Sequence, residues 1–163
     1  MIKVWYRLNL IMTFIWSFVI NTAYWIKHIH QLSDARKKKV ELIENIKTIR
    51  DVGRVMTQFV WRRDPYYDWT PWVITIVNEK YADDCDGASV LGKFLLKNIG
   101  MKSRILHLRK KGSRIGHAVC LSCDNKVLVT NNHVIIFNEE TRDINDWRFN
   151  VLDTFKFRYD VIL

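Results

Sequence analysis

The segment DDCDGASVLGKFLLKN, residues 83–98, decides the fold. Its second half places apolar residues at helical spacing, and Asp83 or Asp84 is a natural N-cap ahead of them, so we predict a helix over about 85–98 that Gly100 terminates. Cys85 lies at its start, where free N–H groups and the helix dipole favour a thiolate. The apolar residues of this pattern are Val90, Leu91, Phe94 and Leu95.

Segments with the alternating pattern of β-strands follow this helix. We predict a tight turn at Asp124-Asn125 that joins two of them into a hairpin. Because helices come first and antiparallel strands follow, the order of elements predicts an α+β fold. The predicted strands cover 103–109, 114–123, 126–130, 132–137 and 151–162.

Two further helices are predicted between the N-terminal segment and Cys85. Apolar residues spaced by three or four predict one helix over about 35–62, capped at Ser33-Asp34 and ended at Asp64-Pro65. After an aromatic-rich loop, Pro71 can open a short helix through about Lys80.

Residues 8–26 contain no charged side chain and are close to the length of ~20 residues with which a helix crosses a bilayer. Asn9, Thr13, Ser17 and Asn21, however, form a polar stripe at four-residue spacing. The stripe fits a membrane helix with a partner, an interfacial helix, or a soluble helix packed on its apolar side. We therefore predict a packing helix or membrane anchor over 1–34 and a catalytic domain over 35–163.

The chain has 163 residues and a formal net charge of +9, which permits an anionic partner. Its basic residues are scattered rather than gathered into a stripe, so nucleic-acid binding is the less favoured interpretation. The cysteine count is odd, which disfavours a disulfide framework, and Cys120 and Cys123 are interpreted as ordinary strand residues. Reduced thiols favour a cytoplasmic location, and the basic residues after residue 26 would keep a membrane-anchored domain there.

Cys85, His117 and Asn131 together suggest nucleophilic catalysis. A thiol nucleophile needs a base within reach, and the base needs a group that orients it. His117 begins the strand-like run that follows the helix, and Asn131 ends the next run. If 118–123 pairs with 126–131, Asn131 falls roughly opposite His117, where its amide oxygen could accept the ring N–H. Taken singly, each residue also has an ordinary structural interpretation.

Several motifs resemble the core of the transglutaminase-like superfamily, most closely its bacterial and phage cysteine proteinases. The resemblance covers about residues 40–132 and implies a papain-like α+β core with a Cys-His-Asp/Asn triad. The motifs are Asp68-Trp69-Thr70-Pro71, Asp84-Cys85-Asp86, Gly116-His117-Ala118-Val119 and Val129-Thr130-Asn131-Asn132.

The resemblance implies a role for each matching position. Cys85 would be the nucleophile, His117 the base and Asn131 the orienting residue, although this family usually has aspartate there. The Trp69 indole and the Cys85 N–H are candidates for the oxyanion hole. Asp83 and Gly87 also depart from the family pattern, which favours glycine and a second acidic residue at these positions.

No cofactor is required by this chemistry. Some relatives bind calcium through acidic residues beside the cysteine, and Asp84 and Asp86 could do so here, although helix capping is the favoured role.

The sequence therefore predicts a cysteine hydrolase that cleaves peptide or isopeptide amide bonds through a thioester, with a protein or peptide as substrate. One alternative is an inactive module of this fold that binds a protein, a membrane surface or nucleic acid. A second alternative is a crosslinking acyl transferase, because both enzymes share the acyl-enzyme.

Overall fold

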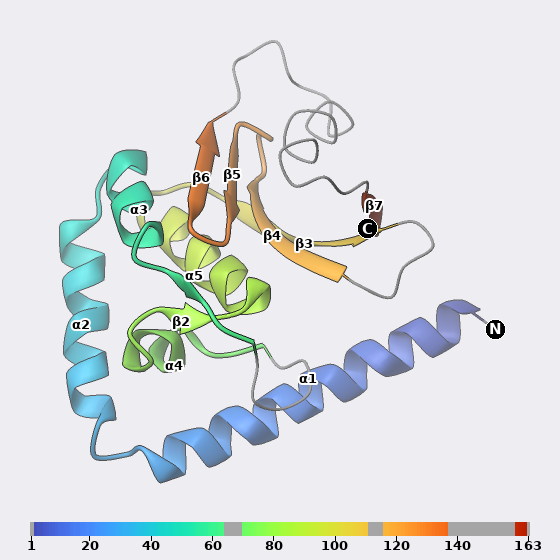
Figure 1. Ribbon diagram of the computed structural model, residues 1–163, viewed down its shortest axis with the longest axis horizontal. Coiled ribbons are helices and arrows are strands. Elements are labelled where there is room, and N and C mark those ends of the chain that lie inside the picture. The colour runs from blue at the N-terminus through green and yellow to red at the C-terminus, as the bar shows by residue number, and fades with distance from the viewer. Residues whose placement is uncertain (1, 64–69, 111–115, 137–158, 163) are drawn as a thin grey trace.

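Helix α5 (Cys85–Asn98) packs across an antiparallel β-sheet, and this pair forms the centre of the fold (Figure 1). The structure is a computed structural model, which describes residues 2–63, 70–110, 116–136 and 159–162. In the described residues the sheet has five strands in the order β6-β5-β4-β3-β7. The strands are β3 (Ser103–Lys110), β4 (Gly116–Ser122), β5 (Val127–Thr130), β6 (His133–Ile136) and β7 (Tyr159–Ile162).

The contact between α5 and the sheet depends on Gly92. A Cβ atom at this position would lie 2.7 Å from Cγ1 of Val129 and 3.5 Å from Cβ of Cys120, so only glycine lets the helix approach this closely. Cys120 and Val129 are directly paired across β4 and β5, and both are fully buried. The face of the sheet that carries them is therefore the face that packs on α5.

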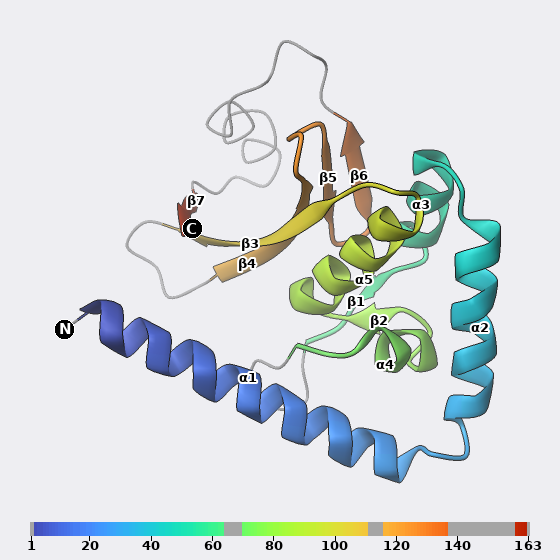
Figure 2. The same cartoon turned by 180° about the vertical axis from the view of Figure 1, so that it is seen from behind.

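The remaining helices lie near α5, mostly on the side away from the sheet, and one of them also contacts the edge strand β6. Figures 1 and 2 show a long helix along one edge of the molecule and a second helix that turns away from its end. The chain then forms two short helices and a two-stranded parallel sheet before α5 begins. These elements are α1 (Ile2–Lys27), α2 (Leu32–Asn45), α3 (Ile49–Met56), β1 (Val60–Trp61), α4 (Val73–Asn78) and β2 (Ala82–Asp83).

The predicted single helix over 35–62 is wrong, because the chain breaks into α2 and α3. Ile46 is extended at the break, with φ −98° and ψ 109°. Thr48 then caps α3: its side chain accepts a hydrogen bond from the Asp51 N–H, and the Asp51 carboxylate accepts one from the Thr48 N–H. Such a capping box is a strong local signal for a helix start, and it interrupts the apolar pattern that runs through both helices.

The other predicted elements are close to those observed. The α+β class is confirmed, as are the helix from Cys85, its Asp84 cap and the strands after Gly100. Gly100 has a φ of +79°, as expected of a helix-terminating glycine. The prediction for 71–80 is longer than α4 at both ends, and Cys123 lies in the turn after β4 rather than in the strand. Of the last predicted strand, only 159–162 falls within the described residues.

Helix α1 packs on the rest of the protein through its polar side. The soluble-helix alternative predicted the opposite, a helix that packs through its apolar side. Ser17 and Asn21 are buried against the segment 70–75, whereas Met12 and Ile26 on the other side are 61% and 64% exposed. Within the described part of the chain, none of the helices combines the length and apolar character needed to cross a bilayer.

Candidate active site

Cys85 is the first residue of α5, and its thiol lies against the start of strand β4. The Asp84 side chain caps the helix by accepting a hydrogen bond from the Asp86 N–H at 2.9 Å. The backbone N–H of Ala118 donates a hydrogen bond to the Cys85 sulfur. Ala118 directly follows His117, so the contact brings the thiol to the backbone beside the candidate base.

The pKa of Cys85 is raised to about 12, opposite to the direction expected from the helix dipole. Burial of the thiol is the main cause, and the negative charges of Asp86 and Asp84 add to it. The hydrogen bond from Ala118 lowers the pKa but does not outweigh these effects. The thiol is therefore protonated near neutral pH, and it needs a base to become a nucleophile.

The His117 ring is half-buried, and its Nε2 atom lies 2.8 Å from Oγ1 of Thr130. Burial holds its pKa below the ordinary value of 6.5, which keeps the imidazole neutral and able to accept a proton. Within the described residues, no hydrogen bond joins the ring to the Cys85 thiol. Because side chains alternate along β4, the His117 side chain lies on the face opposite to Cys120, so Cys85 and His117 are neighbours through the Ala118 backbone alone.

Thr130, rather than Asn131, contacts the His117 ring. Cys120 pairs with Val129 and Leu121 with Leu128, and continuing this register places Asn131 opposite Ala118. Because side chains alternate along a strand, His117 shares a sheet face with Thr130, and Asn131 belongs to the opposite face. Sequence reasoning missed Thr130, although the predicted pairing of 118–123 with 126–131 already implied this alternation.

Asn131 stands at the end of β5 in a left-handed conformation, with a φ of 44°. Its side-chain oxygen Oδ1 is buried and has no hydrogen-bond partner among the described residues. Asparagine tolerates this backbone conformation better than most residues do, so the position has a structural reason for its amide. Its role in orienting His117 stays a prediction.

Asp83 and Gly87 fit one another beside the cysteine. Asp83 is buried at 6% exposure, and its carboxylate accepts a hydrogen bond from the Asp84 N–H at 2.8 Å. A Cβ atom at Gly87 would lie 2.6 Å from both Cβ and Cγ of Asp83, which is far inside van der Waals contact. The missing side chain at Gly87 therefore makes room for the one at Asp83.

Trp69, a candidate for the oxyanion hole for which packing is the favoured role, lies outside the described residues. The Cys85 backbone N–H is at the first position of α5, where helix N–H groups lack intrahelical partners. No group of three or more His, Cys, Asp or Glu side chains that could hold a metal occurs within the described ranges. Asp84 and Asp86, for which the sequence favours helix capping over calcium binding, lie at the helix start, where Asp84 serves as the cap.

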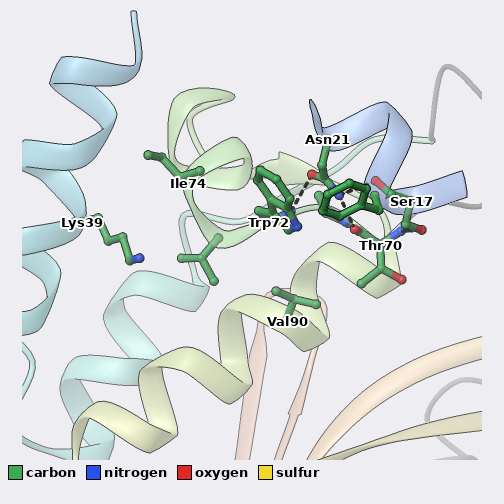
Figure 3. A pocket seen from close by; sticks show the side chains of 10 residues that line it. Ser17, Asn21, Lys39, Thr70, Trp72, Ile74 and Val90 are labelled. Carbon is green, nitrogen blue, oxygen red and sulfur yellow. Dashed lines mark hydrogen bonds between the residues drawn. The ribbon is translucent and has the colours of Figure 1, made fainter. Parts of the chain in front are cut away.

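A cavity of about 600 Å³ lies on the other side of α5, between this helix and α1 and α4 (Figure 3). Its walls are mostly apolar and include Phe18, Trp72 and Val90, with Lys39 at one side. Cys85, His117 and Asn131 are not among its lining residues, so it is separate from the candidate catalytic residues.

No family model matches the sequence, and no curated protein shows a significant match. Among solved structures, the chain is similar to calcium-bound LapG of Legionella pneumophila, with 15% sequence identity and a TM-score of 0.48. The match covers 63% of this chain and 66% of that one, just under two thirds of its length. LapG is a bacterial transglutaminase-like cysteine protease with a papain-like fold.

The order found here, helices followed by an antiparallel sheet, is that of an α+β fold. At 15% identity the likeness assigns neither a residue role nor an activity to this chain.

We expect Gly87→Ala to lower the free energy of unfolding by about 1–3 kcal/mol, because the added methyl group overlaps Asp83. The same substitution should cost less in an Asp83→Gly background, which removes the overlapping atoms. Urea unfolding of the four proteins in a double-mutant cycle measures this coupling. Equal costs in the two backgrounds would show that the positions are independent.

We expect Asp86→Asn to lower the pKa of Cys85, because the substitution removes a negative charge that opposes thiolate formation. The midpoint of iodoacetamide labelling against pH, followed by peptide mass spectrometry at Cys85, should move to lower pH. Glu44→Gln, an exposed charge removal on α2, is the matched control and should leave the midpoint in place. An unchanged or higher midpoint in Asp86→Asn would contradict the electrostatic account.

Proposed function

We propose that the chain is a cysteine hydrolase that acts on peptide or isopeptide amide bonds, with Cys85 as nucleophile and His117 as base. The observation that carries the proposal is the position of Cys85 at the capped start of α5, a helix that packs on β4, the strand that carries His117. It is supported by the lowered pKa of the half-buried His117 ring, which keeps the imidazole neutral. This combination supplies both the nucleophile and the base that acyl transfer requires.

In the proposed reaction, the Cys85 sulfur attacks the amide carbonyl while the thiol proton passes to the His117 ring. The C–N bond then breaks, His117 returns the proton to the leaving amine, and the acyl group remains on sulfur as a thioester. Water attacks the thioester with His117 again as base, which releases the acid and the free thiol. We expect the Cys85 backbone N–H to donate to the oxyanion of the tetrahedral intermediate.

The pKa directions favour a resting site in which both the thiol and the imidazole are neutral. They disfavour a resting thiolate–imidazolium pair, so the proton moves to the imidazole during the attack. The pKa of Cys85 is raised and that of His117 is lowered, so both groups are neutral before substrate binds. Reaction then requires the ring, which belongs to the sheet face away from α5, to come within hydrogen-bond distance of the thiol.

Calcium has no part in this proposal, although LapG is described as calcium-bound. Calcium takes about six to eight oxygen ligands, and Asp84 and Asp86 supply two carboxylates. Asp84 already uses Oδ1 to cap α5. A crosslinking acyl transferase, the second alternative from the sequence, would form the same acyl-enzyme as a hydrolase. In that enzyme an amine, instead of water, would attack the thioester.

We expect His117→Ala to reduce the iodoacetamide labelling rate of Cys85 by about tenfold or more near neutral pH, because the thiol loses its base. His107→Ala removes an exposed histidine from the neighbouring strand and is the matched control. Labelling in a Cys123→Ser background avoids competition from that exposed thiol. If both histidine variants label Cys85 at the wild-type rate, the enzyme proposal fails.

Thr130→Val and Asn131→Gly distinguish the two candidates for the group that orients the ring. Thr130→Val removes the hydroxyl bonded to Nε2 with little change in shape, so we expect slower Cys85 labelling and a stability loss of about 1 kcal/mol. Asn131→Gly removes the amide but keeps the left-handed backbone accessible, and it should label at nearly the wild-type rate. The reverse ranking would restore Asn131 as the orienting residue.

A further inference from the structure

The orientation of helix α1 is reversed relative to an ordinary surface helix. Asn21 is 1% exposed: its Nδ2 donates to the Thr70 carbonyl, and its Oδ1 accepts from the Trp72 N–H, both at 2.9 Å. Ser17, one turn earlier, accepts from the Thr70 N–H at 2.8 Å (Figure 3). The polar side of the helix is therefore the side that docks on the protein.

Tyr24 continues this anchoring one turn further along the same side. Its hydroxyl donates to the Glu79 carboxylate and accepts a hydrogen bond from the Asn78 amide at 2.6 Å. Burial and the bond to Glu79 raise the pKa of Tyr24 to about 12. Trp25 also packs on the small cluster of Leu32, Ala35 and Val77. Contacts at residues 17, 21 and 24 together fix the rotation of the helix about its axis.

The opposite side of α1 carries exposed apolar residues. They follow one another at helical spacing, so they form a single face directed away from the body. In Figures 1 and 2 the helix runs along the edge of the molecule, and no other described element lies beyond it. The members of this face are Met12 (61% exposed), Ile15 (49%), Trp16 (45%), Val19 (50%) and Ile26 (64%).

We propose that this apolar face lies on the surface of an anionic lipid bilayer, with α1 parallel to the membrane plane. A helix with apolar residues on one side and polar residues on the other inserts its apolar face at the boundary of headgroups and acyl chains. Trp16 is a residue type enriched at that level of the membrane. The inference does not depend on Cys85 or on any activity of the candidate site.

Charge argues for an anionic bilayer rather than a second copy of the chain. Lys27 follows Ile26 at the end of α1, and three exposed basic residues, Arg36, Lys37 and Lys38, lie near the start of α2. The whole chain carries a net charge of +9. Anionic headgroups attract such a cluster, whereas a second copy would bring the same positive charge to the contact.

The test is flotation of the full chain with vesicles of phosphatidylcholine alone or mixed equally with phosphatidylglycerol. We expect the protein to float with the anionic vesicles and Ile15→Glu/Val19→Glu to reduce the bound fraction by about tenfold or more, because both changes place charge on the apolar face. Val40→Glu/Ile43→Glu is the matched control: it changes two exposed residues of α2 and should float like the wild type.

The charge contribution is tested by Arg36→Gln/Lys37→Gln/Lys38→Gln. This variant should lose about tenfold or more of its binding to anionic vesicles, and added salt should weaken the binding of the wild type. Circular dichroism establishes that every variant is folded. The proposal is overturned if the wild type does not float with anionic vesicles, or if the Ile15→Glu/Val19→Glu protein floats equally well. A wild-type dimer in solution that this double substitution dissociates, without vesicle binding, would identify a second copy as the occupant instead.

Discussion

The close approach of α5 to the sheet is the constraint on which the rest of the structure depends. It exists because Gly92 leaves the space that the Val129 side chain occupies. The same approach carries the N-terminus of α5 to the start of β4, where the Ala118 N–H meets the Cys85 sulfur. A single packing contact therefore builds the core and also places the candidate nucleophile beside the strand that bears the candidate base.

The cysteine environment explains why a helix N-terminus alone does not make a reactive thiolate. The capping that starts α5 uses Asp84, and Asp86 follows in the first turn, so the helix start that could stabilise a negative sulfur is itself lined with negative charge. Burial adds to this effect, and the pKa of Cys85 rises. The thiol therefore becomes a nucleophile only if a neighbouring base removes its proton, and His117 is the candidate base.

Much of the fold was predictable from sequence because its signals are local. The Asp84 cap, the helix pattern after Cys85, Gly100 and the turn at Asp124-Asn125 each act within a few residues of the structure they specify. The break between α2 and α3 was missed because the apolar pattern continues through it, although Thr48 and Asp51 carry a capping signal of their own. The packing side of α1 could not be predicted, since it depends on backbone groups at residues 70 and 72 that are distant in sequence.

For the candidate site, the sequence predicts Cys85 and His117 but does not predict that Thr130 contacts the His117 ring. Opposite positions on paired strands do not by themselves bring side chains together, because the two-residue period of a strand decides which side chains share a face. Thr130 follows from that period, and Asn131 does not. The family resemblance matches sequence positions and carries no information about the face on which a side chain lies, so the role of Asn131 stays a prediction.

The hydrogen bonds that hold α1 have a consequence for the entropy of the chain. Neighbouring strands from β3 to β6 follow one another in sequence, so their pairing closes short segments. The bonds from Ser17 and Asn21 instead join residues 49 to 54 positions apart. Closing a longer segment costs more conformational entropy, though the cost rises only slowly with length. The contacts of helix α1 with the body thus close longer segments of chain than the pairing of neighbouring strands does. They consist largely of polar hydrogen bonds, whereas α5 is held by apolar burial.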